Sequence, residues 1–181
     1  MRNRAPPIES TLRLALREFD RNDVDDIHAL DSDPLVMRFI GDGSVSTRED
    51  AHAAIERTLA RYIDTPGLGV WRVARRDDGV FIGWVSLKHA GASPDIEIGY
   101  RLRPVAWGQG FATELARAML VRGFDGLRLD RIIGVTHPDN LASQRVLVKA
   151  GLRDEGFGHY YDRDLRLFAL DRARWREAAM P

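Results

Sequence analysis

The stretch 97–113 constrains the fold of this chain more than any other. Apolar and polar residues alternate from Ile96 to Leu102, which is typical of a strand with one buried face. Gly108 and Gly110 then interrupt this pattern, and apolar residues recur at helical spacing beyond them. A turn between a strand and a helix gathers unpaired backbone N–H groups at the positive end of the helix dipole. The stretch therefore predicts an anion-binding turn within an α/β fold.

The remaining pattern divides the chain into further strands and helices. A capping box at Ser46–Glu49 is expected to open one helix, and Asp162–Asp164 to join the last two strands. No internal repeat or linker is visible, so we expect a single domain over residues 1–181, with residues 1–10 as a flexible leader. The expected strands are residues 12–17, 70–75, 80–87, 96–102, 131–136, 152–161 and 165–170. The expected helices are residues 24–30, 34–39, 47–65, 140–150 and a helix from residue 110 that ends at Gly123 or Gly126.

Charge and cysteine content exclude several functional classes. The 27 basic and 27 acidic residues balance, so no long-range field would recruit nucleic acid or an anionic membrane. No segment approaches the ~18 apolar residues of a membrane helix, and a cytoplasmic location is expected. The chain has no cysteine, which rules out disulfides, thiolate metal sites and a covalent intermediate on cysteine. Its five histidines lack the H-x-x-x-H spacing of a zinc site, so no metal is expected.

Two familiar phosphate-binding loops do not match the glycine turn. A Walker loop requires a lysine, and the turn contains none. A dinucleotide fingerprint requires a third glycine, where Thr113 stands here, and an acid at the end of the next strand. Asp130 instead precedes that strand. From the two glycines alone, a simple reversal of the chain without any ligand is an equal alternative.

The residues around the turn carry a family resemblance. The run 107–112, Trp-Gly-Gln-Gly-Phe-Ala, resembles the acyl-CoA-binding motif of the GCN5-related N-acetyltransferase (GNAT) superfamily, usually written Arg/Gln-x-x-Gly-x-Gly/Ala. Gly110 and Ala112 occupy the two small positions, and Trp107 replaces the expected Arg or Gln. This aromatic form of the motif is typical of the branch that acetylates ribosomal-protein N termini. The segments 14–17, 33–37, 97–100 and 140–145 follow in that branch's order, so the resemblance covers roughly residues 12–175.

The resemblance implies a GNAT-type domain with a central mixed, mostly antiparallel sheet of about six or seven strands, splayed at the acetyl-CoA site and flanked by helices. It implies acetyl-CoA as acetyl donor, with the pyrophosphate on the glycine turn and the pantetheine arm paired with the preceding strand. Asn140 equally fits a helix cap, and one residue can serve both roles. The implied cofactor-binding residues are Tyr100, Arg101, Leu102, Gly108, Gln109, Gly110, Phe111, Ala112, Thr113, Asn140 and Ser143.

The implied reaction is direct attack of a primary amine on the acetyl thioester in a ternary complex, in agreement with the lack of cysteine. Glu97 is the candidate base, because superfamily glutamates used this way often lie on the central strand. A solvated carboxylate, or a partner for an arginine, is the alternative for Glu97. Many relatives have a tyrosine acid where Leu147 stands here. The ribosomal-protein branch has a serine at Ser143, which makes this hydroxyl the candidate donor to the leaving thiolate.

The resemblance leaves the acceptor open. A protein N terminus, an aminoglycoside, a polyamine or another small amine would fit a primary-amine site. A non-catalytic acyl-CoA-binding sensor of the same fold is an alternative from another functional class, because Leu147 and Trp107 depart from the family pattern. Homodimers are common among relatives. We therefore expect an N-acetyltransferase whose partners are acetyl-CoA and an amine, without nucleic acid or membrane.

Overall fold

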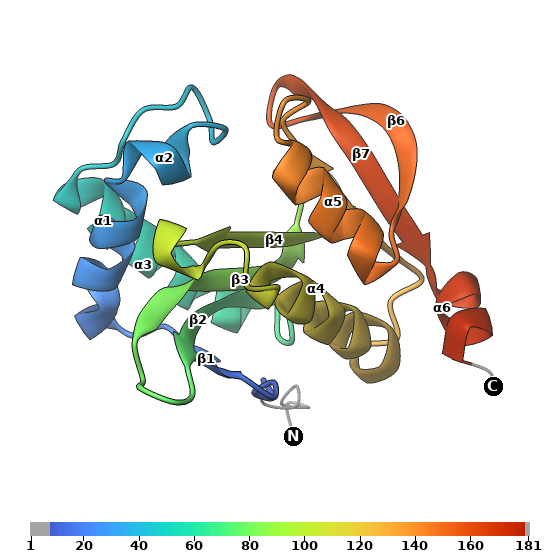
Figure 1. Cartoon of the computed structure of the whole chain (residues 1–181), viewed down its shortest axis with the longest axis horizontal. Coiled ribbons are helices and arrows are strands. Elements are labelled where there is room, and N and C mark those ends of the chain that lie inside the picture. The colour runs from blue at the N-terminus through green and yellow to red at the C-terminus, as the bar shows by residue number, and fades with distance from the viewer. Residues whose placement is uncertain (1–7, 180–181) are drawn as a thin grey trace. The chain divides into compact units, whose positions relative to one another are not determined.

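The computed structural model describes residues 8–179 and has an α/β fold, as predicted (Figure 1). Seven strands form one mixed sheet in the order β1-β2-β3-β4-β5-β7-β6. The first seven residues of the expected leader lie outside the described residues. The strands are β1 (Leu14–Glu18), β2 (Gly69–Arg75), β3 (Phe81–His89), β4 (Ile96–Leu102), β5 (Arg131–Thr136), β6 (Arg153–Tyr160) and β7 (Arg163–Asp171).

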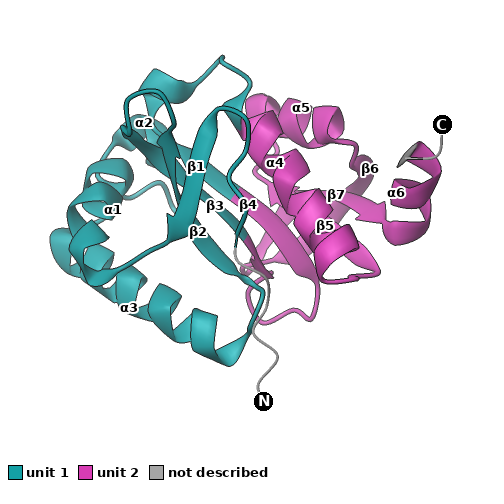
Figure 2. Cartoon of the chain, turned by 90° about the horizontal axis from the view of Figure 1, so that it is seen from below, with its two compact units in different colours: residues 1–86, 100–111 teal, residues 87–99, 112–181 magenta. Residues whose placement is uncertain are grey.

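The chain forms two compact units, which Figure 2 shows in teal and magenta. Unit 1 consists of residues 1–86 and 100–111, and unit 2 consists of residues 87–99 and 112–181. Both β3 and β4 therefore begin in one unit and end in the other. As a result, Glu97 belongs to unit 2, whereas the end of the same strand belongs to unit 1.

Unit 1 is built on a layer of helices that covers β-strands. The helices are α1 (Val24–Asp31), α2 (Pro34–Met37) and α3 (Arg48–Asp64), preceded by the short 3-10 helix η1 (Arg21–Asp23). Apolar side chains of α1 and α3 recur at helical spacing and share one core with side chains of α2 and β3. The buried members of this core are Phe19, Val24, Ile27, Leu30, Val36, Ala51, Ile55 and Phe81.

The cap of α3 differs from the expected one by a single residue. Thr47, and not Ser46, is the N-cap, and its side chain accepts a hydrogen bond from the Asp50 backbone N–H. The Asp50 carboxylate in turn accepts the Thr47 backbone N–H at 2.9 Å. The expected box paired Ser46 with Glu49, and the sequence offers both pairs at the same spacing. The shorter Asp side chain completes the observed box.

Unit 2 contains an antiparallel group of strands covered by helix α5 (Leu141–Ala150). This helix packs against β5, β6 and β7, and Figure 1 shows it beside β7. Gly134 on β5 permits the close packing, because a Cβ at that position would lie 2.6 Å from the Leu147 side chain. Leu147 itself is buried. The α5 helix ends at Gly151 with a left-handed φ of 114°, as the sequence predicts.

The connection between β6 and β7 is tighter than expected. Tyr160 pairs with Arg163, so only Tyr161 and Asp162 form the turn. Both residues have positive φ, at 55° and 57°. Two-residue hairpin turns with two positive φ values normally contain Asn or Gly. The prediction of a turn at Asp162–Asp164 was therefore wrong, since local sequence gives no glycine signal for this geometry.

Helix α4 (Phe111–Val121) begins where the sequence predicts, directly after the glycine turn. It continues into η3 (Arg122–Gly126), which ends at the second of the two expected glycines, but its π-helical form was not expected. A C-terminal helix, α6 (Arg172–Ala179), also escaped prediction. Between β4 and α4 lies a short 3-10 helix, η2 (Pro104–Ala106). None of the helices in the described part of the chain combines the length and apolarity needed to cross a membrane.

Substituting Gly151 tests the left-handed cap of α5. Gly151→Ala should lower the free energy of unfolding by about 1–2 kcal/mol, because an L-residue is strained at this φ. For a domain of this size the melting temperature should fall by about 2–8 °C. The nearest atom to the added Cβ, on Leu170, is 4.0 Å away, so strain and not a clash causes the loss.

A matched control is Gly126→Ala. The added Cβ would meet no atom within 4 Å, and φ is not left-handed there. Thermal unfolding should shift by about 0.5 kcal/mol or less in either direction. Equal melting temperatures for the two variants would contradict the role assigned to Gly151.

Candidate functional site

The predicted anion-binding turn has the backbone that its glycines allow. Gly108 and Gly110 have φ values of 75° and 80°, and α4 starts at the next residue, Phe111. A Cβ on Gly108 would meet no protein atom within 4 Å. The turn is therefore open beside its first glycine, and its geometry exposes the amides at the start of an eleven-residue helix.

An arginine distant in the sequence packs on this turn. Arg13 donates from Nη1 to the carbonyl of Gln109 at 2.9 Å, and its guanidinium lies 4.5 Å from the centre of the Phe111 ring. A Cβ on Gly110 would lie 3.6 Å from Arg13 Nη2. A positive charge thus accompanies the turn although the run 107–112 contains none. Sequence reasoning missed Arg13, because it precedes β1 within an alternating pattern that indicates only a strand.

Trp107, which replaces the Arg or Gln of the family motif, has a structural contact. Its indole Nε1–H donates to the carbonyl of Leu102 at 2.7 Å, while 48% of the residue is exposed. This bond ties the end of β4 to the turn across η2. The carbonyl of Leu102 is consequently already bonded within the protein.

Arg101 anchors β4 to the end of α1 within unit 1. Its Nη1 lies 2.6 Å from Asp31 Oδ1, and both side chains are largely buried. The guanidinium also lies 5.1 Å from the centre of the Trp84 ring. The side chain of Arg101 therefore has a packing role. Its predicted ligand contact would have to use the backbone.

In unit 2, Asn140 is the N-cap of α5. Its Oδ1 accepts the backbone N–H of Ser143 at 3.1 Å. Ser143 lies in the first turn of the helix and is partly buried. Among the described residues, the cap uses only the oxygen of the Asn140 amide and not its Nδ2 group. Capping is therefore observed for Asn140, and it leaves a donor for a ligand.

Leu147 lies in the core and not in an open site. It is 1% exposed and packs against the backbone of Gly134 on β5. A tyrosine there would have to displace this packing, so the departure from the family pattern has a structural reason. The hydroxyl of the family's tyrosine is thus absent from this position.

Glu97 on β4 lies in a small polar network of unit 2. It is 7% exposed, and Lys88 Nζ on β3 donates to its Oε2 at 3.3 Å. The hydroxyl of Tyr161, from the β6–β7 turn, donates to the same oxygen. Lys88 also donates to the Tyr161 hydroxyl at 2.7 Å. The alternative of an arginine partner is thus replaced by a lysine and a tyrosine, which sequence reasoning did not select.

A second tyrosine–carboxylate pair lies beside this network. The Tyr160 hydroxyl donates to Asp95 Oδ2 at 2.7 Å. Ser93 Oγ donates to the same carboxylate oxygen at 3.1 Å. Burial, together with the neighbouring Asp95, raises the pKa of Tyr160 to about 12. The phenol is therefore protonated at neutral pH and fastens the hairpin end to the start of β4.

The predicted site residues divide between the two units. Unit 2 holds Glu97, Ala112, Thr113, Asn140 and Ser143. Unit 1 holds Tyr100, Arg101, Leu102, Gly108, Gln109, Gly110 and Phe111.

The sequence contained only weak signals for the residues that were missed around Glu97. Lys88 is one of only two lysines in the chain, and Tyr161 is the expected last residue of a strand.

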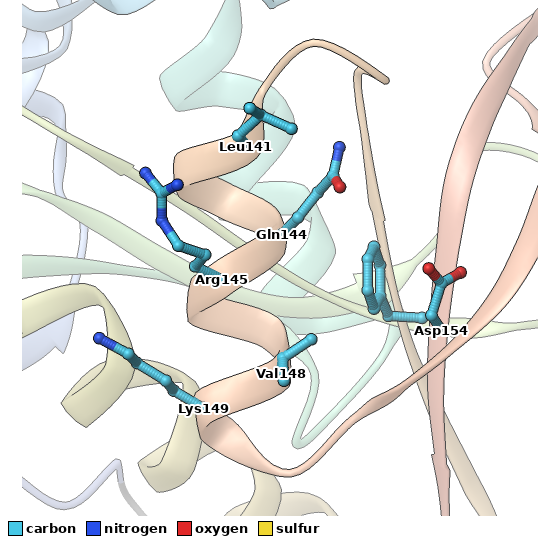
Figure 3. Close-up of a pocket in the computed structure, with 7 residues that line it drawn as sticks. Leu141, Gln144, Arg145, Val148, Lys149 and Asp154 are labelled. Carbon is cyan, nitrogen blue, oxygen red and sulfur yellow. The ribbon is translucent and has the colours of Figure 1, made fainter.

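Other features of the described residues do not suggest a separate site. No cluster of three His, Asp or Glu side chains suited to a metal occurs in the part of the chain that the structure describes. An open, mainly apolar pocket lies between α5 and the strands beside it (Figure 3). None of the predicted site residues lines it. Its lining consists of Leu141, Gln144, Arg145, Val148, Lys149, Asp154 and Phe168.

Known proteins resemble this chain in sequence. A family model described as an acetyltransferase (GNAT) domain matches residues 13–153. The uncharacterized N-acetyltransferase YoaA of Bacillus subtilis is 36% identical over 157 residues, which cover 86% of this chain and 88% of the relative. An FsC-acetyl coenzyme A-N(2)-transacetylase of Aspergillus fumigatus is 32% identical over 168 residues, which cover 88% of this chain and 71% of that protein.

The fold has close counterparts among solved structures. The structure of RimL, a ribosomal L7/L12 alpha-N-protein acetyltransferase in complex with coenzyme A, has a TM-score of 0.76 at 17% identity. The match covers 92% of this chain and 98% of that one. The family model and the relatives confirm the family resemblance of the sequence. This chain therefore belongs to the GNAT family of acetyl-CoA-dependent N-acetyltransferases.

Proposed function

We infer that this enzyme moves the acetyl group of acetyl-CoA directly to a primary amine in a ternary complex, with Glu97 as the base. The observation that carries the inference is a buried glutamate whose hydrogen bonds engage only one of its two carboxylate oxygens among the described residues. The other oxygen is available to accept a proton. The absence of cysteine supports a reaction without an acetylated cysteine intermediate.

The glycine turn supports the cofactor placement. Left-handed glycines let phosphate oxygens approach the amides of residues 108–113 closely, and the N-terminus of α4 adds its dipole. Arg13 adds a positive charge next to Gly110. Tyr100, Arg101 and Leu102 would contact the pantetheine arm through their backbone, and Asn140 through its Nδ2 group. The acetyl-CoA site is thus proposed to use backbone groups more than side chains.

The proposed reaction transfers one acyl group. The acceptor ammonium loses a proton to Glu97, and its neutral nitrogen forms a bond to the carbonyl carbon of the thioester. The nitrogen of the resulting intermediate then loses a second proton to solvent. The oxyanion of the tetrahedral intermediate would accept a backbone N–H near Leu102. The carbon–sulfur bond then breaks, and CoA departs as a thiolate that takes a proton from solvent. The Ser143 hydroxyl would donate a hydrogen bond to the departing sulfur.

The acceptor belongs to the class of primary amines, either a protein N terminus or a small amine. RimL is named an alpha-N-protein acetyltransferase, and the Aspergillus relative is named an N(2)-transacetylase. These names define the first members of an acceptor panel, to which an aminoglycoside and a polyamine are added. The chemistry of the proposed base is the same for all of them, because each presents an ammonium group that must lose a proton.

An acceptor panel tests the reaction. Incubation with acetyl-CoA should release free thiol with at least one amine, and the product should carry a new amide. The chain has no cysteine, so a thiol reagent reports only CoA and has no protein background. Tight binding of acetyl-CoA without thiol release for any amine would contradict the proposed transfer and favour a sensor.

Substitution of Glu97 tests the base. Glu97→Gln preserves the shape of the side chain but removes its ability to take a proton. General-base catalysis contributes typically 10²–10⁴-fold, so kcat should fall by about 10²-fold or more. The KM for acetyl-CoA should change by about twofold or less, because the substitution leaves the groups proposed to bind acetyl-CoA unchanged. A variant with wild-type kcat would remove Glu97 from the mechanism.

A bulky residue in the turn tests the cofactor placement. Gly110→Trp should weaken acetyl-CoA binding by about tenfold or more, equivalent to about 1.4 kcal/mol, because it fills the approach to the amides. The matched control is Gly79→Trp in the β2–β3 turn. Gly79 also has a positive φ, at 71°, and open space around it. Calorimetric titration should give normal acetyl-CoA affinity for this control, and equal losses in both variants would refute the placement.

A further inference from the structure

The hydrogen bonds around Glu97 give two further residues a task in the reaction. We propose that Tyr161 and Lys88 are positioning residues, which hold Oε2 of Glu97 so that Oε1 faces the acceptor amine. This role rests on the proposed function of Glu97 as base. Neither residue was expected from the sequence.

The first reason is the cost of a buried carboxylate. Glu97 is 7% exposed, and a buried charge without partners is strongly unfavourable. Lys88 supplies the opposite charge, and the Tyr161 hydroxyl supplies a neutral donor to the same oxygen. Lys88 also donates to the Tyr161 hydroxyl. The three groups therefore form a closed network, in which each member fixes the other two.

The second reason is the distribution of these bonds over the carboxylate. Within the described residues, both side-chain hydrogen bonds of Glu97 go to Oε2. These bonds fix the plane of the carboxylate and therefore the direction of Oε1. Oε1 itself accepts no side-chain hydrogen bond from the described residues and can still accept one. Tyr161 is 45% exposed, so solvent and solutes can reach the network from its side. A base needs both a fixed direction and an accessible acceptor.

The third reason is the strained turn that carries Tyr161. A tyrosine with a φ of 55° is unfavourable, and the adjacent Asp162 has a φ of 57°. Asn or Gly at either place would form this turn more easily. Strained residues of this kind cluster at functional sites, where surrounding contacts hold them. Here the contacts are the bonds of the Tyr161 hydroxyl and the packing of its ring beside Gly91, where a Cβ would lie 3.4 Å from it.

The neighbouring pair of Tyr160 and Asp95 separates structural from positioning roles. Tyr160 and Tyr161 are consecutive, and each donates its hydroxyl to a carboxylate at the start of β4. Tyr160 is partly buried and completes the strand register with Arg163. Its hydroxyl bonds to Asp95 and not to Glu97. Tyr160 thus offers a comparator of the same chemistry, whose carboxylate partner stands two residues before the proposed base in the sequence.

A lysine suits the network around Glu97 better than an arginine would. Lys88 and Lys149 are the only lysines of the chain, whose other cationic side chains are arginines. An ammonium is compact and can direct separate donors to Glu97 and to Tyr161, whereas a planar guanidinium has a fixed fork. Lys88→Arg should therefore restore only part of the kcat that Lys88→Met loses.

Steady-state kinetics with an acceptor from the amine panel tests the proposal. Tyr161→Phe removes one hydroxyl and should lower kcat by about tenfold, with the KM for acetyl-CoA within about twofold. In a Glu97→Gln background the same substitution should change kcat by less than about twofold, because its effect passes through Glu97. Lys88→Met should behave in the same way in both backgrounds.

Two controls identify effects of hairpin stability alone. Tyr160→Phe should lower the melting temperature but leave kcat within about twofold, and Asp162→Gly should raise the melting temperature without changing kcat. Tyr161→Asn relaxes the turn, so it should retain the melting temperature and still lose kcat as Tyr161→Phe does. This combination of kept stability and lost turnover is not expected of a structural residue.

The outcomes separate this proposal from the proposed function. If Tyr161→Phe retained the wild-type kcat, the positioning role would be overturned. The same would follow if its effect on kcat were fully additive with that of Glu97→Gln. Neither result would contradict the proposed acetyl transfer. Absence of thiol release from the wild-type protein would overturn both. If Lys88→Met fails to fold, the Tyr161 and Glu97 variants decide the proposal by themselves.

Discussion

The burial of one carboxylate organises much of unit 2. Glu97 lies on β4 opposite Ile133 of β5, at the position where the two strands pair in parallel. A charge at this place requires partners that can be buried with it. They come from β3 and from the β6–β7 turn, so three separate segments must meet for the carboxylate to be tolerated. The same requirement explains why a tyrosine occupies a turn that prefers small residues.

The glycine turn of unit 1 depends on backbone conformation and not on a buried side chain. Its backbone conformation depends on the missing side chains of Gly108 and Gly110 and needs little help from packing. Arg13 and Trp107 then fasten the turn by hydrogen bonds to backbone carbonyls. A site made of backbone groups needs this kind of external support, because it has few side chains of its own to fix its shape.

The departures from the family motif have structural explanations. Trp107 replaces a polar residue and holds the Leu102 carbonyl, while the positive charge near the turn comes from Arg13. Leu147 replaces a tyrosine and fills the core above Gly134. Tyr161, which contacts the proposed base, lies in the β6–β7 turn and does not take the place of that tyrosine.

Local chemistry determined the parts of the structure that depend on neighbouring residues. The strand β4, the glycines before α4 and the cap and C′ glycine of α5 all follow from short-range signals, and the structure confirms these elements. The alternating burial expected along β4 is not observed, because Glu97 is buried as well as Ile98. The lack of cysteine likewise follows from the sequence alone. The cap of α3 lies one residue later than expected, because two overlapping pairs in the sequence fit the spacing of a capping box. Short-range signals could not decide between the two pairs.

Only the tertiary structure decided which side chains surround Glu97. Tyr161 is 64 residues from Glu97 and 73 residues from Lys88 along the chain. Their contact depends on strand order and on the exact length of the β6–β7 turn, and a turn one residue longer would point Tyr161 elsewhere. Periodicity records which face of a strand is buried but not which strand lies next to it. The candidate base could therefore be identified from the sequence, whereas the residues that hold it could be identified only from the fold.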